Sequence, residues 1–244
     1  MDDPTLSTIE QFLDQLIQKL DLRYDVYFKY QIGKVPNRSD WNKHYIRDYI
    51  TIRPYLPINV PTVILNIGCG IDLHDALLFY HYLLINPDEA KNIKFYLCDK
   101  TLVTLTGETG GGYDDTHDFY NDMELAKQAL CLAGILESNI YLIDADPIKI
   151  AELKTVDLIL SLHSWGFHYP ISVYLDPVNK ILSPNGKIII DIRRGKENGE
   201  LENFQITRID TQLKRERVVL ENKIITSDDE EVDEDDEYED IIDP

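Results

Sequence analysis

The chain has 244 residues, of which 43% are hydrophobic, and this suffices for one large domain with a deep core. A formal net charge of −20 disfavours nucleic acid as a partner, and twelve of the carboxylates lie in residues 228–243. The acidic start and the lack of a run of about eighteen apolar residues predict a cytoplasmic protein that is neither secreted nor inserted in a membrane. The three cysteines form no CxxC pair, so neither a zinc motif nor a disulfide framework is indicated.

The first predicted element is an amphipathic helix over residues 5–22. Its apolar residues recur at intervals of three and four: Ile9, Phe12, Leu13, Leu16, Ile17 and Leu20. The next stretch, 24–55, is rich in aromatic and basic residues and is interrupted by Pro36 and Pro54. We therefore predict that residues 1–58 form an N-terminal helical cap on the main sheet.

After Pro61 the sequence alternates between short apolar runs and helical segments. Strands are predicted over 62–67, 93–98, 140–143, 156–162 and 187–192, and helices over 73–84, 122–136 and 172–182. A turn is predicted at 183–186, and residues 204–211 and 215–220 are predicted to add an antiparallel hairpin. The predicted fold class is α/β, with a Rossmann-like, doubly wound, mostly parallel seven-stranded sheet over residues 59–224.

Two segments fall outside this alternation. Residues 106–120 form a long glycine-rich and then polar-aromatic insertion, which predicts a lid over substrate with Tyr113 and His117 contacting the acceptor. No metal centre is predicted there, because carboxylates are common in solvated loops. Residues 225–244 have too few apolar side chains to bury a core, so we predict a disordered acidic tail that can meet a protein partner.

The most informative motif is the glycine turn after the first predicted strand, Asn66-Ile67-Gly68-Cys69-Gly70. Glycine can adopt positive φ and lets a ligand approach the backbone, and ligands of open α/β sheets lie beyond the carboxyl ends of the strands. The third glycine of the dinucleotide fingerprint is replaced by Leu73, which disfavours a pyrophosphate ligand. The motif resembles the first motif of class I S-adenosylmethionine-dependent methyltransferases. This resemblance implies S-adenosylmethionine as cofactor, bound near Asn66, Gly68 and Gly70.

The ends of the next strands extend the resemblance. Asp99 matches the family's ribose-binding acid, although a strand-end or helix-capping role is an open alternative. Asp144 and Ala145 resemble the segment that meets adenine, although a polar turn before Pro147 would look the same. Ser161, which ends the fourth predicted strand, completes the predicted cofactor-binding set.

The segment after the fourth strand, residues 163–170, is where the family places the motif next to the transferable methyl group. We predict His163 as the catalytic base, with His168 as the rival base and Trp165 shaping the acceptor pocket. The alternative is aromatic packing under the next helix, with both histidines hydrogen-bonded and inert.

The predicted function is S-adenosylmethionine-dependent O-methylation of a small hydroxylated acceptor, because residues 164–170 resemble a segment of sugar O-methyltransferases. Two alternatives remain open at this point. One is a catalytically silent, methyltransferase-like binding or scaffold protein, prompted by Asn66, Asp72 and the acidic tail. The other is a nicotinamide-dependent oxidoreductase, which would need pyrophosphate at the glycine turn.

Overall fold

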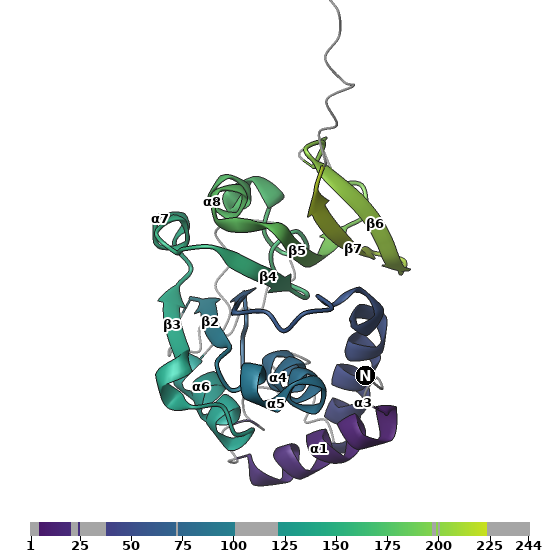
Figure 1. Ribbon diagram of the computed structural model, residues 1–244. Coiled ribbons are helices and arrows are strands. Elements are labelled where there is room, and N and C mark those ends of the chain that lie inside the picture. The colour runs from purple at the N-terminus through teal and green to yellow at the C-terminus, as the bar shows by residue number, and fades with distance from the viewer. Residues whose placement is uncertain are drawn as a thin grey trace, which may run out of the picture.

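The computed structural model describes residues 5–20, 24, 38–71, 73–100, 122–196, 199 and 201–223. They contain a seven-stranded sheet in the order β3-β2-β1-β4-β5-β7-β6 (Figure 1). The strands are β1 (Val63–Ile67), β2 (Lys94–Asp99), β3 (Ile140–Asp144), β4 (Val156–Ser161), β5 (Leu182–Arg193), β6 (Phe204–Thr211) and β7 (Arg215–Asn222). The first five strands are parallel, and β7 runs antiparallel to both of its neighbours. The predicted mostly parallel, seven-stranded sheet and its terminal hairpin are confirmed.

Helices cover both faces of the sheet (Figure 1). One layer holds α1 (Leu6–Lys19), α3 (Arg38–Ile52), α4 (His74–Ile85), α5 (Pro87–Ala90) and α6 (Met123–Leu132), and the other holds α7 (Pro147–Ala151) and α8 (Leu175–Ile181). Three single 3-10 turns connect them: η1 (Arg53–Tyr55), η2 (Glu137–Asn139) and η3 (Ile171–Val173). Across the described residues, none of these helices combines the length and the apolar character needed to span a membrane.

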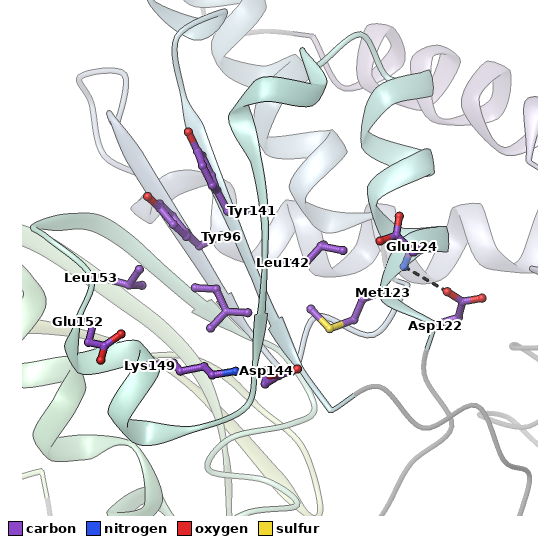
Figure 2. Close-up of a pocket in the computed structure, with 11 residues that line it drawn as sticks. Tyr96, Asp122, Met123, Glu124, Tyr141, Leu142, Asp144, Lys149, Glu152 and Leu153 are labelled. Atoms are coloured by element: carbon purple, nitrogen blue, oxygen red, sulfur yellow. Dashed lines mark hydrogen bonds and ion pairs between the residues drawn. The ribbon is translucent and has the colours of Figure 1, made fainter.

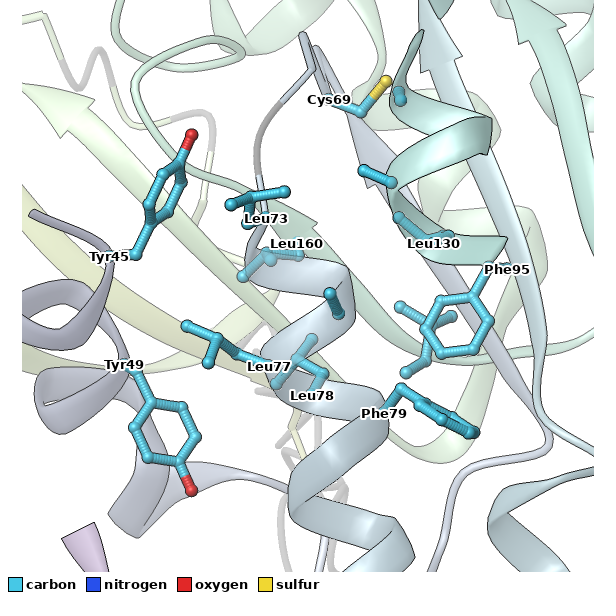
Figure 3. Close-up of a cluster of buried hydrophobic side chains, with 14 of the residues drawn as sticks. Tyr45, Tyr49, Cys69, Leu73, Leu77, Leu78, Phe79, Phe95, Leu130 and Leu160 are labelled. Atoms are coloured by element: carbon cyan, nitrogen blue, oxygen red, sulfur yellow. The ribbon is translucent and has the colours of Figure 1, made fainter. Parts of the chain in front are cut away.

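The N-terminal helices share a hydrophobic core with the sheet. Along β1 the side chains alternate, so that Ile64 belongs to the cluster under α4 and Leu65 to the cluster under α8. Helix α4 is buried on nearly all sides, because it lies between the sheet and the helices α1 and α3. Figure 3 shows Tyr45 and Tyr49 of α3 facing α4 within this cluster. Helices α1 and α3 are therefore packed directly onto the α/β layers.

Two predicted boundaries are wrong. The turn predicted at 183–186 lies inside β5, because Val156 pairs with Leu182 and Leu158 pairs with Lys187, so that the intervening residues bulge out of a continuous strand. The helix predicted over 122–136 ends at Leu132 because Gly134, at a φ of 100°, closes it. The amide of Ile135 then donates to the carbonyl of Leu130, the hydrogen bond of a Schellman motif.

A buried ion network joins α3 to the sheet. The guanidinium of Arg217 on β7 donates to both carboxylate oxygens of Asp191 on β5, at 2.7 and 3.0 Å. It also donates to Asp48 Oδ1 on α3, at 3.1 Å. The side chains of these three residues are at most 1% exposed. Because a buried charge is costly without its partner, this network fixes where α3 lies on the sheet.

We expect Arg217→Met to destabilise the chain by about 3–5 kcal/mol, because it removes the buried guanidinium that Asp48 and Asp191 share. Urea unfolding measures this loss. The control is Arg208→Gln, which removes an exposed partner of Glu216 and should cost less than about 1 kcal/mol. Equal losses in the two variants would contradict the account of Arg217.

Candidate functional site

The glycine turn brings the ends of β1 and β2 together. Gly68 and Gly70 have φ angles of 71° and 54°, in the left-handed region that favours glycine. The amides of Gly68 and Cys69 donate to the carbonyl of Cys98 at 2.7 and 3.2 Å. The amide of Gly70 donates to Asp99 Oδ2 at 2.7 Å. Three of the residues predicted to hold the methyl donor therefore lie in one hydrogen-bonded unit.

The carboxylate of Asp99 is fixed in orientation. Its Oδ2 accepts from Gly70, and its Oδ1 accepts from the amide of Lys100 at 2.7 Å. Asp99 is therefore a cap of the turn, and its contact with a ribose stays a prediction.

Asn66 and Ser161 lie beneath this unit. The Asn66 amide donates to Asp75 Oδ2 at 2.7 Å, and Asn66 is 1% exposed. Ser161 is fully buried, donates to the carbonyl of Ile67 at 2.7 Å and accepts from the amide of Trp165 at 2.9 Å. In this structure the two side chains position the end of β1 and the loop after β4, and their contact with a cofactor stays a prediction.

The predicted adenine segment lies at the edge strand β3. Asp144 pairs with the ammonium of Lys149, and the amide of Ala145 donates to the carbonyl of Asp99 at 3.1 Å. The Ala145 amide, which was predicted to bind adenine, thus donates a hydrogen bond from the end of β3 to the end of β2. Its contact with adenine stays a prediction.

A cavity of about 670 Å³ lies beside β3 (Figure 2). Its walls include Asp144, Lys149 and the stacked rings of Tyr96 and Tyr141, whose centroids are 4.7 Å apart. Of the described residues predicted to hold the donor, Asp144 alone is on these walls. The cavity therefore does not coincide with the glycine turn.

The loop after β4 packs on the glycine turn. A Cβ atom at Gly68 would lie 1.8 Å from Ser164 Oγ, so that only glycine fits beside this loop. His163, the residue before Ser164, has a φ of 60°, which is strained for a side chain that is not glycine. The loop thereby places His163 beside the predicted donor site.

Two other residues of this loop, Trp165 and His168, have different surroundings. Trp165 is fully buried, and its indole N–H donates to the carbonyl of Ile171 at 2.8 Å. It supports the loop from the core side, and a contact with the acceptor stays a prediction. The His168 ring lies edge-on to Phe167, with centroids 4.8 Å apart, and is partly exposed.

His163 belongs to a polar cluster that the sequence did not reveal. Its Nε2 lies 3.5 Å from Asp48 Oδ2 and accepts a hydrogen bond from Arg215 Nη1 at 2.9 Å. The same Asp48 oxygen lies 3.6 Å from His44 Nε2 and 3.4 Å from His74 Nε2. These side chains come from α3, α4, β7 and the loop after β4. Asp191 was the one visible signal, since it stands as a carboxylate inside the apolar run of β5.

The cluster holds an ionised carboxylate among imidazoles. Burial alone would raise the pKa of Asp48, but the contacts with His163 and His74 and the charge of Arg217 hold it far below its usual range. Burial lowers the pKa of His44 to about 4, against the opposing charge of Asp48. At neutral pH, His44 is therefore uncharged and offers a lone pair.

The strand order relates the sheet to a known architecture. The dinucleotide-binding order is 3-2-1-4-5-6, and here the additional antiparallel strand β7 lies between β5 and β6. A glycine turn ends β1 and an acidic residue ends β2, as the resemblance implies. The chain has a Rossmann-like, doubly wound α/β fold.

Similarity of this chain to known proteins is found among solved structures. No protein-family model and no curated protein matches the sequence. Among solved structures, a Geobacter sulfurreducens methyltransferase has 15% identity and a TM-score of 0.48, with 89% of this chain and 96% of that chain covered. The mitomycin 7-O-methyltransferase MmcR has 11% identity and a TM-score of 0.49, with 88% and 67% covered. A Nostoc punctiforme protein with a suggested O-methyltransferase activity has 13% identity and a TM-score of 0.48, with 75% of this chain and 56% of that chain covered. This chain therefore spans just over half the length of the Nostoc protein.

Several predicted features lie outside the described residues. These are Tyr113 and His117, the rest of the insertion 106–120, and the tail 225–244. Their roles stay predictions.

We expect Gly68→Ala to destabilise the chain by more than Gly195→Ala. Gly195 has a similar φ of 75° with nothing within 4 Å of an added Cβ, so its substitution costs only the left-handed strain of about 1–2 kcal/mol. Adding Ser164→Gly to Gly68→Ala should recover the extra stability that Gly68→Ala loses relative to Gly195→Ala, because it removes the clashing side chain. Urea unfolding of the parent chain and the three variants measures this, and equal losses for the two glycine substitutions would refute the close approach.

Proposed function

We propose that this chain transfers the methyl group of S-adenosylmethionine to a hydroxyl group of a small, sugar-like acceptor. One observation carries the proposal: the loop that bears His163 is packed on a glycine turn that resembles the family's donor motif. Such transfer is an in-line attack on the sulfonium methyl, so the protein mainly positions the two reactants and removes a proton from the hydroxyl.

His163 has the contacts that a proton acceptor needs. A guanidinium has no lone pair, so Arg215 must donate to His163 Nε2, which then carries a lone pair. The carboxylates of Asp48 and Asp191 lie 3.5 and 3.7 Å from the ring nitrogens. Both carboxylates offset the charge of Arg215, which lies 2.9 Å from the same ring.

The surroundings of this loop suit a hydroxylated ligand. The guanidinium of Arg193 lies over the ring of Phe167, 5.2 Å from its centroid. The ammonium of Lys100 lies 5.9 Å from the centroid of the Tyr169 ring. Aromatic faces beside polar groups provide both the apolar contact and the hydrogen bonds that a sugar-like acceptor requires.

A catalytically silent, methyltransferase-like binding protein is the second candidate. The observation that favours it is that two groups predicted to bind the donor already donate hydrogen bonds within the protein. The Asn66 side-chain amide donates to Asp75, and the Ala145 backbone amide donates to Asp99. Donor binding without transfer to any hydroxylated acceptor would identify this role.

We expect Asp99→Ala to weaken binding of S-adenosylhomocysteine by roughly 1.5–3 kcal/mol, the scale of hydrogen bonds to a charged group. Isothermal titration calorimetry measures the affinity. The matched control is Asp157→Ala, because Asp157 accepts from the amides of Thr62 and Val63 at the opposite end of the sheet. If both variants bind like the parent chain, the ribose role of Asp99 is refuted.

We expect His163→Asn to lower the rate of methyl transfer by about 10²–10⁴-fold with little change in donor affinity. Asparagine tolerates the left-handed φ of this position but cannot accept the proton. The measurement is transfer of a labelled methyl group to a panel of hydroxylated acceptors, with His168→Asn tested beside it. A parental rate in His163→Asn and a large loss in His168→Asn would move the base to His168.

A further inference from the structure

We propose that His44, Asp48 and His163 form a binding site for a divalent transition-metal ion, with Zn²⁺ as the best match. His44 and Asp48 are four residues apart on α3 and therefore lie on the same face of the helix. The loop after β4 brings His163 to the same place, so that one ligand atom from each residue lies within 4.8 Å of the others. Two imidazoles and one carboxylate are a known ligand set of zinc sites that keep an open position.

The distances from Asp48 to the two histidines fit an ion. Ligand atoms that are each about 2.1 Å from a tetrahedral Zn²⁺ lie about 3.4 Å apart. Asp48 Oδ2 lies 3.6 Å from His44 Nε2 and 3.5 Å from His163 Nε2. These separations are longer than ordinary hydrogen bonds and match two ligands of one ion.

Asp48 Oδ2 lies among three imidazole nitrogens, at 3.4 to 3.6 Å. The Asp48 side chain is 1% exposed, and Oδ2 has no hydrogen-bond partner within the described part of the chain. If His163 Nε2 carries a proton, its N–H faces the N–H of Arg215, and two donors point at each other. If Nε2 instead carries a lone pair, that lone pair faces the lone pairs of Asp48 Oδ2. A cation between Asp48 and His163 resolves the second arrangement.

The surrounding contacts support this role. Asp48 Oδ1 accepts from Arg217, which orients the carboxylate and leaves Oδ2 for the ion. His163 Nδ1 lies 3.7 Å from Asp191 Oδ2, a partner of the kind that fixes the ring of a metal-binding histidine. The side chains of His44 and His163 are 39% and 36% exposed, so the ion can enter from solvent.

Arg215 is the group that an ion must displace. Its Nη1 lies 2.9 Å from His163 Nε2, and its charge repels a cation. Arg215 also contacts Asp191 at 3.0 Å and Asp210 at 2.9 Å, so it keeps two carboxylate partners after it releases His163. The ion would use the same lone pair of His163 as the proposed reaction, but its binding does not depend on a methyl donor.

The test is calorimetric titration of the full chain with Zn²⁺ alone, followed by dialysis and elemental analysis. We expect one ion per chain, with affinity lowered at least about tenfold in His44→Ala and in His163→Asn. The matched control is His168→Ala, which removes a histidine of the same loop and should leave the affinity unchanged.

Cobalt(II) gives a second measurement that a loss of folding cannot imitate. The parent chain and His168→Ala should show the visible absorption of a tetrahedral nitrogen and oxygen site, and His44→Ala should not. Circular dichroism without metal verifies that each variant is folded. Absence of binding, or equal binding by the parent chain and His44→Ala, would overturn the proposal.

Discussion

The placement of Arg217 between Asp48 and Asp191 is the constraint on which the site depends. A fully buried guanidinium requires carboxylates on two sides, and these come from α3 and β5. Because the network is buried, α3 has little freedom to slide on the sheet. The same network that joins the N-terminal helix to the sheet therefore brings Asp48 within 3.5 Å of His163.

The loop after β4 is held from three directions. Ser161 and Trp165 fix it to the core, Ser164 packs on Gly68, and the His163 amide donates to Asp191 Oδ2 at 3.1 Å. These contacts maintain the strained φ of His163, since a residue in the left-handed region persists only when its surroundings impose it. Strain of this kind at the end of a parallel strand is typical of a functional position.

The sequence predicted the sheet well because each strand is a short apolar run with a clear boundary. It was wrong at residues 183–186, where a strong local turn signal is overridden by pairing of the flanking residues with β4. Gly68, Gly70 and Asp99 could be predicted together because parallel strands end at one edge of the sheet. The cluster around Asp48 could not, because its side chains come from α3, α4, β7 and the loop after β4, and no local pattern encodes how these elements pack.

A structure of the full chain with S-adenosylhomocysteine tests the account of the site most directly. We predict that both ribose hydroxyls contact Asp99 and that the sulfur atom faces the loop bearing His163. A nucleoside bound only in the cavity beside β3, with no contact to Asp99 or to the glycine turn, would contradict it.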